Sequence, residues 1–124
     1  MNEFFTHLDH VQLAMPKGKE EEARLFYVNL LGFVEIEKPI ALQHRGGVWF
    51  KSGHIELHLG VEDHFIPAKK AHPALHVHHL ETLIHHVKEQ QIPYIEDKNL
   101  PFADRIYLHD PFGNRIEMIE RHVK

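Results

Sequence analysis

The stretch Asp110–Glu120, DPFGNRIEMIE, combines a tight turn with a following strand. Its proline suits the second position of a turn and its glycine allows a positive φ, so the segment predicts a hairpin connection. After the turn, Glu117 stands between two apolar residues of the strand. An earlier stretch, SGHIELHLG at Ser52–Gly60, has the same order of glycine turn and apolar strand, with Glu56 in its middle. The chain therefore twice places a carboxylate inside an apolar strand.

These two stretches belong to an internal repeat, in which each half reads as a strand, a helix and three further strands. His10 and His72 are 62 residues apart, and Glu56 and Glu117 are 61 apart, so two different features repeat with nearly one period. We therefore expect a single domain made of two modules. The expected boundaries are 1–124 for the domain, about 1–60 for the first module, about 61–70 for a linker and about 71–124 for the second module.

Hydrophobic periodicity indicates the elements of each module. Helices are predicted where apolar residues recur at i, i+3, i+4 and i+7, and strands where short apolar runs end at glycine or proline. The expected strands are 6–14, 33–36, 47–51, 55–59, 73–78, 94–95, 105–109 and 115–120, and the expected helices are 19–31 and 80–90. Each strand has one apolar face, and both helices have an apolar stripe to cover such a face. The sequence therefore predicts an α+β fold with the helices on one side of the sheets.

Composition excludes several classes of protein. A chain of 124 residues with 43% hydrophobic content suits one core. The formal net charge of −4 and the scattered lysines and arginines argue against nucleic acid as a partner. No basic segment followed by a long apolar run begins the chain, and no stretch is long enough to span a bilayer, so we expect a cytoplasmic protein without membrane contact. The chain has no cysteine, which excludes thiolate metal sites, but it has 14 histidines.

The strand faces opposite the apolar ones suggest a metal site. Side chains alternate across a strand, and at four matched positions these faces hold only imidazoles and carboxylates, from His10, Glu56, His72 and Glu117. A strand face that was only exposed to solvent would also contain lysine, serine and threonine. If the sheets curve, the four groups could converge on a divalent cation, with water completing its shell. Zn, Ni, Mn and ferrous Fe would all suit such a donor set.

Other side chains on the same faces are candidates for substrate contact. His58 lies on the face of Glu56, and either residue could be the ligand. His76 is likewise an alternative to His72, and Gln12 shares the face of His10. The aromatic residues are assigned to packing: Trp49, Phe50 and Phe102.

Five segments across nearly the whole chain resemble the vicinal-oxygen-chelate superfamily of glyoxalases, bleomycin-resistance proteins and extradiol dioxygenases. They are LDHVQLAMP (8–16), ARLFYVNLLGF (23–33), GGVWFKSGHIELHLG (46–60), AHPALHV (71–77) and YLHDPFGNRIEMIE (107–120). The resemblance implies two βαβββ modules forming an open, curved barrel of mixed β-sheet with helices outside. It implies metal ligands on the first and last strand of each module, which matches His10, Glu56, His72 and Glu117. It also implies a homodimer in which two chains share each metal site.

The resemblance points to isomerase or lyase chemistry on a small substrate with vicinal oxygens. A metal there would stabilise developing negative charge, and Glu56 or Glu117 would move a proton from the adjacent carbon. Three alternatives remain: an extradiol-type dioxygenase, a fosfomycin-type resistance transferase and a non-catalytic drug- or metabolite-binding protein. Tyr107 matches a substrate-binding position of the fosfomycin group, but Asp97 and Asp104 stand where that group has basic residues.

Overall fold

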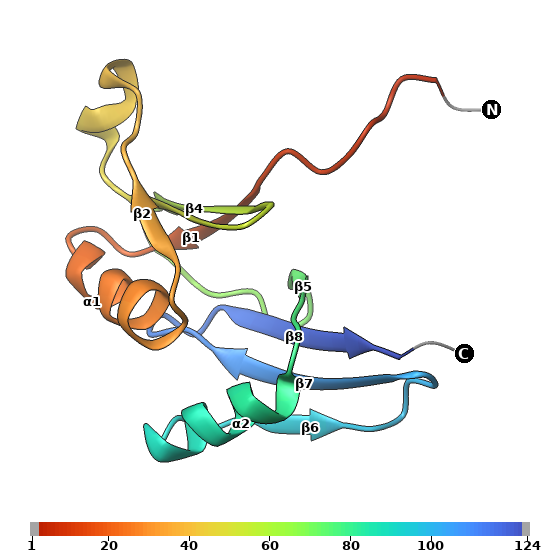
Figure 1. The fold of residues 1–124 in the computed structure, drawn as a ribbon. Helices are drawn as coiled ribbons and strands as arrows, with labels where there is room; N and C mark the ends of the chain where they lie inside the picture. Colours follow the sequence, from red (N-terminus) through yellow and green to blue (C-terminus); the bar gives the residue numbers. More distant parts are fainter. Residues whose placement is uncertain (1–2, 123–124) are drawn as a thin grey trace.

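The computed structural model describes residues 3–122 and arranges them in two four-stranded mixed sheets (Figure 1). The ends of the expected domain range, 1–2 and 123–124, lie outside the described residues. The first sheet has the order β1-β4-β3-β2, and the second β5-β8-β7-β6. Their bounds are β1 Val11–Met15, β2 Val34–Ile36, β3 Val48–Ser52, β4 Ile55–Val61, β5 Ala74–His76, β6 Ile95–Asp97, β7 Ala103–His109 and β8 Arg115–Arg121.

Both sheets are built in the same way. The opening strand of each module pairs in parallel with its last strand, and the other neighbours are antiparallel. This repetition confirms the predicted α+β fold of two modules. The described residues form no closed barrel.

Each module carries one main helix. In the first, α1 (Glu20–Arg24) continues directly into a π-helical segment, η1 (Leu25–Leu30), so the expected helix 19–31 is present with a widened second half. Glutamates fill the first turn, where the helix dipole favours negative charge. In the second module, α2 (Leu80–Glu89) matches the expected helix 80–90. A 3₁₀ segment, η2 (Ile40–Arg45), was not predicted.

The apolar faces of both sheets and the helix stripes pack into one core that spans the modules. On β4 and β8 the apolar residues Leu57, Leu59, Ile116 and Met118 are buried, and Ile55 is partly buried. Tyr27 of η1 is fully buried, and its ring stacks on Phe50 of β3 at 5.1 Å between centroids. The largest fully buried side chains are Tyr27, Phe50, Met15, Leu57, Leu59, Ile106, Leu108, Ile116, Val48 and Val87. Because the helices cover these faces, the opposite faces of the sheets are left for other groups; we call them the site faces.

The structure corrects two predictions. The strand expected over 6–14 begins only at Val11, which pairs with Leu57 of β4, and it continues to Met15. Residues 3–10 belong to no strand and extend away from the sheets (Figure 1). Phe102 was assigned to the core but is 55% exposed. Within residues 3–122, no helix has the length and apolar character needed to cross a bilayer.

Candidate metal centre

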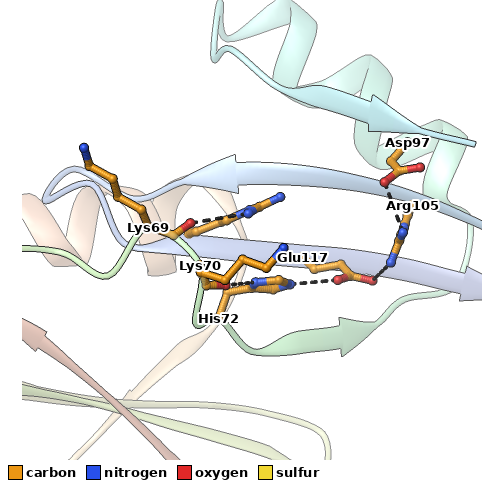
Figure 2. Close-up of polar contacts among 7 residues, drawn as sticks. Lys69, Lys70, His72, Asp97, Arg105 and Glu117 are labelled. Carbon is orange, nitrogen blue, oxygen red and sulfur yellow. Dashed lines mark hydrogen bonds and ion pairs between the residues drawn. The ribbon is translucent and has the colours of Figure 1, made fainter. Parts of the chain in front are cut away.

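Polar contacts link four side chains in a line across the site face of the second sheet (Figure 2). Nε2 of His72 lies 2.9 Å from Oε1 of Glu117. Nη1 of Arg105 donates to Oε2 of Glu117 at 3.3 Å, and its Nη2 donates to Oδ2 of Asp97 at 3.0 Å. Glu117 is only 5% exposed, so its carboxylate is fixed between an imidazole and a guanidinium. We call His72 and Glu117 the second half-site.

The hydrogen bonds of His72 define where its lone pair points. Nδ1 lies 2.8 Å from the carbonyl oxygen of Lys70, and a carbonyl only accepts, so Nδ1 carries the proton. In the neutral ring, Nε2 then presents its lone pair to the Glu117 carboxylate, which is also an acceptor. Two acceptors at this separation need a shared cation, either a proton or a metal ion. Orientation of a ligating imidazole by a backbone carbonyl is common in metal sites, so this donor pair fits a divalent metal.

Tyr107 forms the wall beside the second half-site. It pairs directly with Glu117 across β7 and β8, and it is 7% exposed. The edge-on contact between its ring and that of His72 has a centroid separation of 5.5 Å. The guanidinium of Arg115 lies 4.0 Å over the same ring. The structure thus places Tyr107, a predicted substrate contact, against the second half-site.

The first module holds a corresponding group, His10 and Glu56, which we call the first half-site. Nδ1 of His10 donates to Oδ2 of Asp9 at 2.9 Å, which leaves Nε2 with the lone pair, and this bond lowers the pKa of the Asp9 carboxyl group. Oε2 of Glu56 lies 2.7 Å from Nε2 of His58, which is 4% exposed. His10 stacks on His58 at 4.3 Å between ring centroids. His58 therefore touches both members of the first half-site.

Strand register compares the two modules position by position. In each sheet one residue of the last strand pairs with a residue of the opening strand and with an aromatic residue of the third strand. These sets are Gln12–His58–Trp49 and Ala74–Glu117–Tyr107. By register His58 takes the place of Glu117, whereas the Ile-Glu motif matches Glu56 to Glu117. Both His58 and Glu56 therefore stay candidates for the second ligand of the first module.

The four predicted ligands do not meet within one chain. Among residues 3–122, no three histidine, aspartate or glutamate side chains are placed to hold one metal ion. His10, Glu56 and His76 line a cavity of about 300 Å³. Gln12 and His72 line another of about 450 Å³. Each half-site thus supplies one imidazole and one carboxylate, and the expected convergence of all four is not found in the single chain.

Sequence reasoning missed two residues of this arrangement. Arg105 donates to the Glu117 carboxylate and Asp97 accepts from Arg105, yet neither was a candidate site residue. Strand alternation could have indicated Arg105, because it lies two residues before Tyr107 and shares its face. Trp49 was assigned to the core, but it is only half-buried and stacks on His58.

Comparison with known structures places the chain in a family. A protein from Bacillus anthracis, described as a glyoxalase family protein, is 48% identical, with a TM-score of 0.95; the match covers 98% of this chain and 99% of that one. This protein therefore belongs to the glyoxalase family, within the vicinal-oxygen-chelate superfamily. No protein-family model matches the chain, and no curated protein matches it.

More distant structures share the fold alone. Lactoylglutathione lyase from Agrobacterium tumefaciens is 20% identical with a TM-score of 0.67, and the match covers 89% of this chain and 91% of that one. TnmS3 from Streptomyces sp. CB03234, described as an antibiotic binding protein, is also 20% identical, with a TM-score of 0.71 and coverage of 94% and 97%. The fold thus occurs both in a lyase and in a protein described as binding an antibiotic.

Proposed function

We propose that the protein is a divalent-metal-dependent enzyme that performs isomerase or lyase chemistry on a small substrate with two neighbouring oxygens. The observation that carries the proposal is the orientation of His72, whose Nδ1 donates to a backbone carbonyl and whose Nε2 lies 2.9 Å from the buried carboxylate of Glu117. Nδ1 of His10 likewise donates, in this case to Asp9, so Nε2 is the nitrogen left to bind a metal. Two imidazoles that each have one nitrogen held by a hydrogen bond are arranged as metal ligands usually are. A strand face that was only exposed to solvent would not need this arrangement.

The contacts of the two glutamates suggest different roles. Glu117 has both oxygens engaged, one facing His72 and the other accepting from Arg105, so it suits a fixed ligand. Glu56 is held through Oε2 by His58, and its side chain is 29% exposed. Its other oxygen, Oε1, can therefore reach a substrate and take a proton from the carbon beside the substrate oxygens. A bound metal would supply Lewis-acid stabilisation of the charge on those oxygens.

We also propose that the protein works as a homodimer, in which the first half-site of one copy meets the second half-site of the other. Each half-site offers one imidazole and one carboxylate. His10 and Glu56 line one cavity of the chain, and His72 lines another. Three or four protein ligands are usual for a catalytic or structural zinc site. One half-site is thus too small alone, and two copies would bring together two complete sets.

Metal content tests the proposed function. Purified protein should hold close to one divalent metal per chain after loading with Zn²⁺, Ni²⁺, Mn²⁺ or, without air, Fe²⁺, as measured by inductively coupled plasma mass spectrometry. His72→Ala and Glu117→Ala should lose that metal, whereas the control His44→Ala, on an exposed residue of η2, should keep it. Folded wild-type protein that takes up none of the four metals would contradict the proposal and favour a metal-free binding protein.

A further inference from the structure

Three aromatic rings stack in a column across the site face of the first sheet. The rings of Trp49 and His58 are 3.7 Å apart between centroids and 2° from parallel. The rings of His58 and His10 are 4.3 Å apart and 20° from parallel. Trp49 lies on β3, His58 on β4, and His10 directly precedes β1, so the ring column crosses neighbouring strands of the sheet. Adjacent strands are about 4.8 Å apart, which lets such rings stack face to face.

His58 is fully constrained at the centre of this column. One face of its ring meets the indole of Trp49, the other meets the imidazole of His10, and its Nε2 contacts Glu56. With 4% exposure, it has little surface left for a substrate. Both members of the first half-site, His10 and Glu56, therefore contact the buried ring of His58.

His10 depends on the column for its orientation. It precedes the first residue of β1, and its side chain is 41% exposed. Its hydrogen-bond partner, Asp9, is 88% exposed, and contacts between exposed groups constrain a side chain weakly. Stacking on His58 is therefore the contact that ties the His10 ring to the buried part of the sheet. A ligand must be held within a fraction of an ångström to bind a metal well.

We propose that Trp49 and His58 are positioning residues, which hold the His10 imidazole in the orientation that presents Nε2 to a divalent metal ion. This inference rests on the proposed function for its metal, but the ring column itself does not require one. The proposal takes Glu56 as the second ligand of the first module. His58 then acts through its contacts with His10 and Glu56, and Trp49 acts through His58. If Trp49 served packing alone, its replacement would lower stability without changing metal affinity.

The test compares substitutions at Trp49 in the full-length protein, with folding checked by circular dichroism. Trp49→Phe keeps an aromatic ring, Trp49→Leu keeps apolar bulk without one, and Tyr94→Leu removes a half-buried ring elsewhere as the control. Isothermal titration with Ni²⁺ and Zn²⁺ should show that Trp49→Leu weakens binding about tenfold or more, the usual effect of losing a residue that orients a ligand. Trp49→Phe should stay within about threefold of the wild type, and Tyr94→Leu should match it.

A second measurement needs no metal. In the apo protein, the ring current of Trp49 should shift the ring-proton signals of His58 upfield, and that of His58 should shift those of His10, in ¹H–¹³C spectra assigned by His58→Gln and His10→Gln. The His58 shift should disappear in Trp49→Leu. Absence of these shifts in the wild type would overturn the ring column, and shifts with unchanged metal affinity in Trp49→Leu would overturn its positioning role. Wild-type protein that binds no metal would instead overturn the proposed function and the metal-positioning role together, while the spectra still decide whether the column exists.

Discussion

The carboxyl group of Asp110 holds the last hairpin in place and is 5% exposed. Its Oδ1 accepts from the backbone amides of Phe112 and Asn114, both at 2.9 Å. Its Oδ2 accepts from the side-chain amide of Asn114 at 2.9 Å and from the hydroxyl of Tyr27 at 2.8 Å. The amide of Asn114 also donates to the carbonyl of Ala14 in the first module. The Asp-Pro-x-Gly-Asn motif therefore joins the last hairpin of the second module to the first module by hydrogen bonds.

Replacing Tyr27 by phenylalanine tests the hydrogen bond between Tyr27 and Asp110. Burial and the Asp110 carboxylate raise the pKa of the Tyr27 phenol well above its ordinary value, so the hydroxyl stays protonated and donates at any working pH. Removing a hydrogen bond to a charged acceptor should lower the free energy of unfolding by about 1.5–3 kcal/mol. Urea denaturation measures the loss, and Tyr94→Phe, on a half-buried ring, should change stability far less. Equal stability of Tyr27→Phe and wild type would show that the bond contributes nothing.

Much of the candidate site follows from alternation along single strands. Knowing that apolar residues face the core is enough to place His10, Glu56, His58 and Glu117 on the site faces. Partners across strands are different, because pairing depends on register. The contact of Arg105 with Glu117 and that of Trp49 with His58 both join residues of different strands. Neither could be read from one strand alone.

At the scale of elements, helix α2 begins with a cap supplied by a strand. Its N-cap residue, His79, has a left-handed φ of 59° and makes no side-chain capping bond. Instead the carboxylate of Glu120 on β8 accepts from the amide of His79 at 3.0 Å and from that of Leu80 at 3.1 Å. A carboxylate is favoured at the positive end of a helix dipole. Glu120 therefore joins β8 to α2 and fixes the start of the helix.

This cap predicts a specific pH dependence of stability. The two backbone hydrogen bonds lower the pKa of Glu120 from its ordinary value of 4.5. A lowered folded-state pKa means that the stabilisation is present above about pH 4.5 and is lost as the pH falls through the lower folded value. Glu120→Gln should thus have a Tm a few degrees below wild type at pH 7, and the difference should shrink towards pH 3. Thermal scans between these values measure it.

The control for this experiment is Glu89→Gln, at the opposite end of α2 on an exposed residue. It should lower the Tm little and show the same pH profile as wild type. A difference between Glu120→Gln and wild type that stays constant from pH 7 to pH 3 would contradict the charge-based cap.

The elements themselves were largely predictable, and the misses share a physical cause. Both long helices follow from their apolar spacing, because that spacing determines which face is buried. The strand expected over 6–14 begins at Val11 instead, since a strand needs a neighbour as well as an alternating pattern. The π-helical widening of η1 was not predicted either, because the apolar residues there follow the ordinary α-helical spacing.

For the whole molecule, the separation of the two half-sites leads to a test with mixed dimers. One chain carrying His10→Ala and another carrying His72→Ala would be co-expressed with different tags, and the mixed dimer isolated. If each metal site combines half-sites from two copies, one site of the mixed dimer contains both mutations and the other contains neither. The mixed dimer should therefore bind about half the wild-type amount of metal, while each single-variant homodimer binds little or none.

Metal content gives the amount of metal bound per dimer, and light scattering gives the oligomeric state. The control is a mixed dimer in which both chains carry His10→Ala, and it should bind as little metal as the single-variant homodimer. A monomeric wild-type protein, or a mixed dimer as empty as its control, would contradict sharing between copies.

The parallel pairing of each opening strand with its module's last strand has a consequence for how the chain folds. Val11 must find Leu57, and Ala74 must find Glu117, so each contact closes a loop of more than 40 residues. The β7–β8 hairpin needs only a short turn between its strands. The loss of chain entropy is larger for a long loop than for a short turn, so the long loops close more slowly. Domains rich in such distant contacts fold over milliseconds to seconds. Both opening strands should thus be the last to dock, and His10 and His72, which lie just before them, would reach their places at the end of folding.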